Sequence, residues 1–236
     1  MAEIAIESLQ VGLPRTLGLE GAPEPMDRPW TTGFFKAPVA GPVWLGAEGL
    51  EGDGVADRRV HGGPEKAVLV YGAPHYPAWE HELGLVLPPG AFGENFTVSG
   101  QTEAEVCLGD IYAVGEALVE VAQPRQPCWK LSRRWRVPDL AVRVQASGRT
   151  GWYLRVHREG RVAAGDRLIL LDRPHPEWTV AEANAVMHAR GEDRAAAALA
   201  ACPALAPGWR KTLEARAATG APTDTRPRLM GPNEPS

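Results

Sequence analysis

The chain has 236 residues, of which 44% are hydrophobic and 23% are charged, and its formal net charge is -4 at pH 7. This composition is typical of a globular protein with a substantial core, and the acidic balance argues against general nucleic-acid binding. No stretch approaches the roughly 20 apolar residues of a membrane span, and residues 1–10 lack the basic start of a signal peptide. The cysteines Cys107, Cys128 and Cys202 form no Cys-x-x-Cys pair, so we expect no disulfide framework, no structural zinc site and a reducing cytoplasm.

The first 173 residues have the pattern of β-structure. Short apolar or alternating runs recur between turn residues, and they predict strands over residues 3–9, 38–46, 66–71, 111–114, 117–122, 152–157 and 168–171. The runs on either side of Gly115-Glu116 are expected to form a hairpin. We therefore predict a mainly β fold, a barrel or a sandwich, over residues 1–173, with short helical inserts near 75–83 and 138–147.

After residue 173 the pattern becomes helical. Thr179 and Glu182 have the spacing of a capping box, in which each side chain bonds to the backbone of the other residue. An alanine-rich helix is predicted from there to about residue 189, followed by helices over 192–201 and 208–218. Helices this short need packing partners, so we predict a three-helix module over residues 174–220. Residues 221–236 are rich in proline and polar residues and are predicted to form a flexible tail.

The most basic part of the chain surrounds Cys128, which lies between Pro127 and Trp129. Residues 123–161 hold ten Lys or Arg and two acidic residues, in a chain that is acidic as a whole. Positive charge near a thiol favours the thiolate, which is both the nucleophile and the metal ligand. A small buried cysteine beside a solvated basic surface would give the same pattern. The residues by themselves leave both interpretations open.

Two other motifs carry polar side chains on glycine-containing turns. His61 precedes Gly62-Gly63, where the glycines either let a ligand approach the backbone or simply let the chain turn. Glu94-Asn95 follows Gly93, where the side chains either take part in a site or cap the turn. The sequence contains no G-x-S-x-G, P-loop, G-x-G-x-x-G or H-E-x-x-H motif. Ordinary hydrolase, nucleoside-triphosphate and zinc-protease functions therefore receive little support.

Taken together, the motifs resemble those of MOSC-domain proteins, most closely the YiiM-like branch. Each motif is short, but seven of them follow one another in the order and spacing of that family, between about residues 3 and 219. They are Gly49–Asp53, residues 61–68, residues 91–96, Gly109-Asp110, residues 123–131, Gly151–Tyr153 and Ala164–Asp166. The resemblance implies a MOSC-type β-barrel that binds the molybdenum cofactor, a molybdopterin bearing a phosphate, and a C-terminal three-helix module.

The resemblance also implies a reaction and its residues. Members of this branch reduce N-hydroxylated compounds, including N-hydroxylated purine bases, to amines, and a separate reductase donates the electrons. Cys128 would be the molybdenum ligand, and His61 or Lys36 would donate a proton or bind the anion. The implied cofactor-binding residues are Arg59, His61, Asn95, Arg125, Cys128 and Arg155. Asp53 and Glu94 would orient them together with Asn95. A homodimer is a further expectation.

Two alternative functions use the same residues. In the first, the protein is a non-catalytic carrier of the cofactor or a sulfur-transfer module, with a persulfide on Cys128, although the chain contains no desulfurase module. In the second, the interleaved Arg and Trp of residues 129–136 belong to a small barrel that binds oligonucleotides. The acidic remainder of the chain argues against the second, so we predict neither a nucleic-acid nor a membrane partner.

Overall fold

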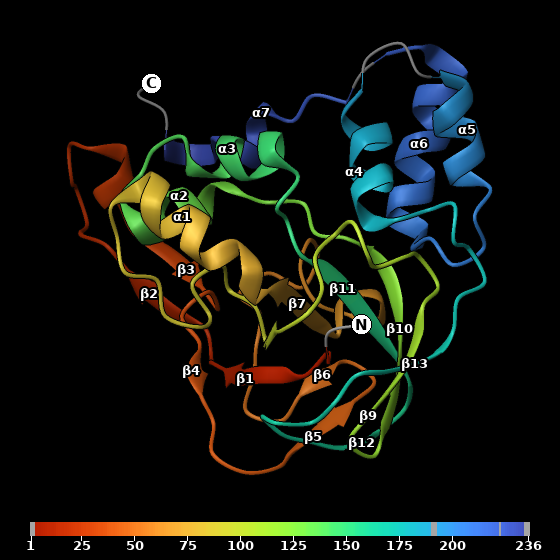
Figure 1. Cartoon of the computed structure of the whole chain (residues 1–236). Coiled ribbons are helices and arrows are strands. Elements are labelled where there is room, and N and C mark those ends of the chain that lie inside the picture. Colours follow the sequence, from red (N-terminus) through yellow and green to blue (C-terminus); the bar gives the residue numbers. More distant parts are fainter. Residues whose placement is uncertain (1–2, 190–192, 222, 234–236) are drawn as a thin grey trace.

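The structure is a computed structural model that describes residues 3–189, 193–221 and 223–233. Within these residues, a curled sheet of eight strands has the order β13-β9-β10-β11-β7-β8-β1-β4 (Figure 1). Its strands are β1 Ile6–Val11, β4 Ala37–Pro38, β7 Val68–Gly72, β8 Phe96–Val98, β9 Ile111–Val114, β10 Ala117–Pro124, β11 Trp152–Arg158 and β13 Ile169–Asp172. The β7–β8 pair is parallel, and the other neighbours in this sheet are antiparallel.

The sheet curls so that β1, next to one edge strand, comes close to β13 at the other edge. Ala5, just before β1, bridges Arg167, just before β13, and the Leu168 N–H donates to the Ile4 carbonyl over 2.9 Å. The resulting half-barrel confirms the predicted barrel class. The predicted hairpin is also present, with Ala117 of β10 opposite Val114 of β9. β10 is buried along most of its length, because it lies between two other strands and contacts helices as well.

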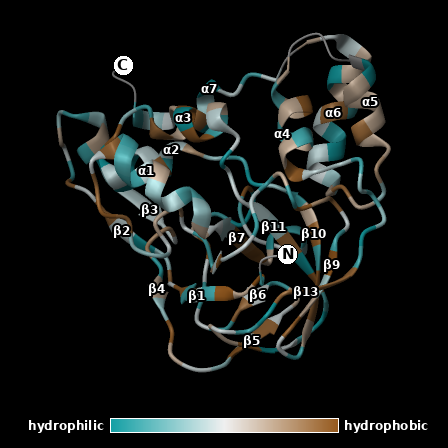
Figure 2. Ribbon diagram, viewed as in Figure 1, coloured by the Kyte–Doolittle hydropathy of each residue, from teal (hydrophilic) through white to brown (hydrophobic). Residues whose placement is uncertain are grey.

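Two smaller sheets complete the β-structure. The first consists of β12 Gly160–Val162, β5 Val43–Gly46 and β6 Gly49–Leu50, and the second of β2 Arg15–Leu17 and β3 Trp30–Thr32. β5 alternates buried and exposed side chains, so that Val43 and Leu45 enter the barrel core. Figure 2 shows hydrophobic residues along the strands of the barrel and on the C-terminal helices.

Three short helices enclose a second apolar cluster beside the barrel. α1 (Tyr76–Leu83) and α3 (Leu140–Ser147) lie where helical inserts are predicted, whereas α2 (Trp129–Trp135) was not predicted. The cluster contains Tyr71, Trp79, Phe92, Leu131 and Leu140, and the Tyr71 and Phe92 rings stack with centroids 4.3 Å apart. α2 begins immediately after Cys128, so this cluster fixes the position of the cysteine.

The C-terminal module consists of α4 (Val180–His188), α5 (Asp193–Ala200) and α6 (Pro207–Thr219). The capping box is formed: the Glu182 N–H donates to Thr179 Oγ1 and the Thr179 N–H donates to Glu182 Oε2, each over 3.0 Å. Trp209 and Leu213 of α6 belong to the same apolar core as the barrel. The predicted helices are therefore present, except that the predicted start at residue 192 lies outside the described residues.

The segment after residue 220 differs from the predicted flexible tail. It forms α7 (Arg226–Leu229) and a short 3-10 helix over Gly231–Asn233, and Leu229 is buried. Arg228 donates to the Pro127 carbonyl and, over 2.6 Å, to Gln145 Oε1. The Asn233 side chain donates to the Trp129 carbonyl over 3.0 Å. This segment therefore packs against the loop that carries Cys128. Among the described helices, none is long and apolar enough to cross a membrane.

Candidate functional site

A cavity of about 530 Å3 opens beside the Cys128 loop. It lies between the loop after β3, the chain from β5 to β7, the turn before β8 and the start of α2. Five of the seven residues that the sequence assigns to the site line this cavity: Lys36, His61, Asn95, Arg125 and Cys128. They come from segments far apart in the sequence, so the fold assembles the site.

Cys128 and His61 face each other in the cavity. Cys128 Sγ lies 3.8 Å from His61 Nε2, and His61 Nδ1 is buried without a hydrogen-bond partner among the described residues. Burial, followed by the charges of Lys130, Lys66 and Arg125, lowers the pKa of His61 from 6.5 to about 4. His61 is therefore a neutral imidazole at pH 7. A histidine with its ordinary pKa of about 6.5 would titrate near working pH. Burial removes this property from His61, although a neutral ring still has one N–H to donate.

Arg125 brings a buried positive charge to the same cavity. Its side chain is only 4% exposed, and Nη2 donates to the Phe92 carbonyl over 3.2 Å. Nη1 is buried and has no partner in the part of the chain that the structure describes. A buried guanidinium with an unpaired donor is costly unless a ligand completes it. The arrangement therefore favours an anion in the cavity.

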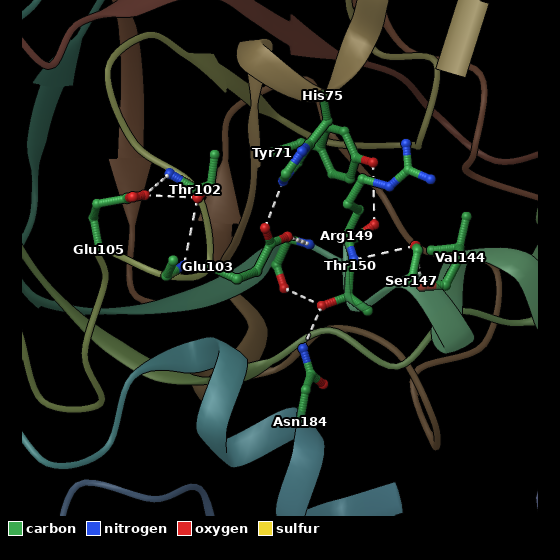
Figure 3. Close-up of polar contacts among 12 residues, drawn as sticks. Tyr71, His75, Thr102, Glu103, Glu105, Val144, Ser147, Arg149, Thr150 and Asn184 are labelled. Atoms are coloured by element: carbon green, nitrogen blue, oxygen red, sulfur yellow. Dashed lines mark hydrogen bonds and ion pairs between the residues drawn. The ribbon is translucent and has the colours of Figure 1, made fainter. Parts of the chain in front are cut away.

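A polar network fixes the backbone that holds Arg125. The Arg125 N–H donates to the Gly151 carbonyl over 2.9 Å, and the Gly151 N–H donates to Glu103 Oε1 over 2.6 Å. Glu103 Oε2 in turn lies 2.6 Å from His75 Nε2 (Figure 3). The buried carboxylate thus holds the turn before β11, and this turn holds Arg125. Sequence reasoning missed Glu103, because it lies in a polar loop without a motif.

The C-terminal module contributes to this turn. Asn184 Nδ2, on α4, donates to Thr150 Oγ1 over 2.8 Å, and Thr150 Oγ1 donates to the Gly151 carbonyl over 3.0 Å. Figure 3 shows Asn184 reaching from α4 toward Thr150. The module is therefore linked by hydrogen bonds to the turn that positions Arg125.

Lys36 and Asn95 converge on Asp53. The Lys36 ammonium forms an ion pair with Asp53 Oδ1, and Asn95 Nδ2 donates to Asp53 Oδ2 over 2.9 Å. Asn95 Oδ1 accepts from the Leu69 N–H over 3.1 Å. Burial lowers the pKa of Lys36, and the nearby Asp53 carboxylate partly offsets this effect. Asp53 thus orients both side chains at the cavity wall, as the resemblance implies.

Glu94 is not among the residues that line the cavity, and it influences the site through the turn that it bonds to. Its carboxylate accepts from the Gly90 N–H over 2.8 Å and from the Phe92 N–H over 3.0 Å. It also accepts from Thr97 Oγ1 over 2.8 Å. These bonds shape the turn whose Phe92 carbonyl receives Arg125. Glu94 therefore orients the site through the backbone.

The structure does not place Arg155 and Arg59, which the resemblance assigns to the cofactor, among the residues that line the cavity. Arg155 Nη2 donates to Glu65 Oε2 over 2.6 Å and to the Ala204 carbonyl over 2.7 Å, so that the residue joins the barrel to the C-terminal module. The Arg59 side chain is 87% exposed and makes two bonds to the Asp57 carboxylate. Both guanidinium groups thus have protein carboxylates as partners.

Several cavity residues were not assigned to the site from the sequence. Lys66 and Lys130 line it, and their ammonium groups donate over 2.8 Å to the carbonyls of Val60 and Thr31. Among the described lining residues there are five Lys or Arg and two carboxylates, so the cavity is positive in net charge. The basic window around Cys128 indicated Lys130, whereas Lys66 lies in the motif of residues 61–68, in which only His61 was assigned a role.

Comparison with known proteins identifies the family. A model of the MOSC domain matches residues 57–169, and a model described as YiiM-like, 3-alpha helix domain matches residues 178–220. Protein YiiM of Escherichia coli is 38% identical over 201 residues, which cover 83% of this chain and 89% of that protein. The chain belongs to the MOSC-domain family, in its YiiM-like branch.

The solved structures agree with this membership. The crystal structure of YiiM from Geobacillus stearothermophilus superposes with a TM-score of 0.76 at 38% identity, and the match covers 91% of this chain and 99% of that one.

A protein of Gibberella moniliformis named "Reductase" is 40% identical over 168 residues. That match covers 68% of this chain but 29% of the fungal protein, so the MOSC chain corresponds to one part of a longer polypeptide.

Proposed function

We propose that this protein is a molybdenum-cofactor-dependent reductase that converts N-hydroxylated compounds, such as N-hydroxylated purine bases, to amines. The observation that carries the proposal is the pairing, in one cavity, of the Cys128 thiol with the buried, incompletely bonded guanidinium of Arg125. The relationship to the fungal protein named "Reductase" supports a redox function for the shared part.

The residues of the cavity fit the cofactor. Its volume of about 530 Å3 lies within the range of about 300–1,000 Å3 that is usual for small-molecule sites. Arg125 Nη1 lacks a partner among the described groups and suits a phosphate oxygen, because a guanidinium pairs with oxyanions in a fixed geometry. Cys128 offers a soft sulfur ligand for the metal. Lys66 and Lys130 add positive charge at the wall.

When bound, the cofactor would supply a metal that passes electrons to the substrate. Reduction of an N-hydroxyl group to an amine consumes two electrons and two protons and releases water. We propose that a separate reductase supplies the electrons and that His61 holds one of the protons at Nε2, which faces Cys128 Sγ. An anion in the cavity would raise the pKa of His61 toward the working range, because negative charge favours the imidazolium. Lys36, held by Asp53, would keep its charge directed at the cavity.

The test is turnover of an N-hydroxylated purine by protein reconstituted with the cofactor, using a chemical reductant and, separately, a flavin-dependent reductase. We expect the wild type to release the amine, and Cys128→Ser to lose at least 100-fold in rate. Arg125→Met should retain the cofactor about 10- to 100-fold more weakly, because one charge-assisted hydrogen bond contributes about 1.5–3 kcal/mol.

Cys202→Ala is the matched control, because it removes a buried cysteine that lies in the C-terminal module. It should behave as the wild type. The proposal fails if fully loaded wild type releases no amine with any donor.

A further inference from the structure

A second cavity, also of about 530 Å3, lies on the other side of the Cys128 loop. Its walls come from the end of α4, from α6, from the segment leading into α7, and from Gln126 and Gln145 of the MOSC domain. Gln126 lines both cavities, whereas Cys128 and Arg125 belong to the first. The two cavities are thus neighbours separated by one loop.

Arg216 on α6 lines this second cavity and has two buried donors without a partner among the described residues. Its side chain is 4% exposed, and Nη1 donates to the Met187 carbonyl over 2.8 Å near the end of α4. Nε and Nη2 are buried and find no partner among residues 3–189, 193–221 and 223–233. Arg216 is linked to the end of α4 through Nη1 alone. This bond does not explain why Nε and Nη2 are buried without a partner. They are placed as the two parallel donors of a guanidinium fork, which pairs with an oxyanion.

Other groups around the cavity match an anion. His188 Nε2 is buried and likewise lacks a partner within the described chain. Arg228 reaches the cavity from α7 and adds a second guanidinium. The one carboxylate among the described lining residues is Asp224, and it already accepts from the Arg226 N–H over 2.9 Å. The lining is therefore positive in net charge.

The remaining wall favours a ligand that carries hydroxyl groups. Gln126 and Gln145 line one side, and Thr212 and Thr225 are among the polar residues of the other. These side chains both donate and accept hydrogen bonds, as hydroxyl groups require. The volume exceeds that of an inorganic anion and is in the range of organic ligands.

We propose that this second cavity binds a small phosphorylated, hydroxyl-bearing molecule, with its phosphate at Arg216, Arg228 and His188. The site is independent of the molybdenum cofactor. It would give the C-terminal module and the ordered α7 segment a shared ligand, next to the loop that carries Cys128.

Isothermal titration of the full chain without cofactor tests this proposal, using ribose 5-phosphate, ribose and inorganic phosphate as probes. We expect ribose 5-phosphate to bind more tightly than inorganic phosphate, and ribose not to bind. Arg216→Gln should weaken ribose 5-phosphate at least tenfold, whereas Arg216→Lys, which keeps the charge, should weaken it less. Lys211→Gln, which removes an exposed charge of α6 outside both cavities, is the matched control and should leave the affinity unchanged.

Thr212→Trp provides a second variant in case Arg216→Gln folds poorly. Thr212 is partly buried on α6 and lines the cavity, so the larger side chain fills the space without removing Arg216. It should abolish binding while the melting temperature remains close to that of the wild type. The proposal is overturned if wild type binds neither phosphate. It is also overturned if Arg216→Gln and Thr212→Trp both bind ribose 5-phosphate as the wild type does, since the phosphate would then occupy another site.

Discussion

His188 should make the protein acid-sensitive in a measurable way. Burial, followed by the charges of Arg228 and Arg216, lowers the pKa of His188 from 6.5 to about 4. The charged groups that line its cavity are these two arginines and Asp224. The folded protein therefore holds His188 neutral, while the unfolded chain takes up a proton as the pH falls through about 6.5.

The direction and size of the effect follow from this difference in proton binding. Between pH 6.5 and 4 the unfolded state binds more protons at this position, so stability falls as the pH is lowered. Each pKa unit corresponds to about 1.4 kcal/mol, and from pH 7 to pH 5 one such histidine removes about 2 kcal/mol from the free energy of unfolding.

Urea unfolding of wild type and His188→Gln at pH 7 and pH 5 measures this contribution. The glutamine variant should lose about 2 kcal/mol less than the wild type over that interval. His81→Gln, at an exposed position of α1, is the control for a histidine outside the cavity. Equal losses in wild type and His188→Gln, or an NMR titration of His188 with its midpoint near 6.5, would refute the reasoning.

Three further changes test the packing around the site. Gly151 has φ +77, and a Cβ added there would lie 2.4 Å from the Val70 carbonyl of β7, so Gly151→Ala should lower the free energy of unfolding in urea by about 2 kcal/mol or more. Gly148 has φ +73 and no atom within 4 Å of an added Cβ, so Gly148→Ala should cost about 1 kcal/mol. Thr179→Ala should lose about 1 kcal/mol of stability through its cap, and Thr179→Ser should lose less. Arg228→Met should speed amide exchange in residues 225–233 with little change in melting temperature, and unchanged exchange would contradict the packing of α7.

The strands and the C-terminal helices could be predicted because their signals are local. Alternating polar and apolar residues mark β1, a short apolar run between turn residues marks β5, and the Thr179–Glu182 spacing marks the start of α4. The segment after residue 220 has no such pattern. Its order comes from tertiary contacts, such as those of Arg228 with the Cys128 loop and the burial of Leu229. Composition alone therefore suggested a flexible tail.

The sequence predicts which residues take part in the site better than it predicts their hydrogen-bond and ion-pair partners. Cys128 and Arg125 stand in one short motif, so their shared cavity follows from the loop between β10 and α2. Arg155 belongs to the same basic window, but its partners Glu65 and Glu120 come from distant segments and hold it elsewhere. The depressed pKa of His61 is likewise a tertiary effect, because it arises from burial and from cations that the fold brings together.

The most direct test of the proposed function is the molybdenum and pterin content of purified wild type beside Cys128→Ser, each before and after reconstitution with the cofactor. We expect molybdenum and pterin in equal amounts in the wild type, and loss of the molybdenum–sulfur contact in the variant by X-ray absorption. Cys202→Ala should match the wild type in both measurements. If neither metal nor pterin binds after reconstitution, or if the metal is held identically without the Cys128 thiol, the assignment of this cavity to the cofactor is contradicted.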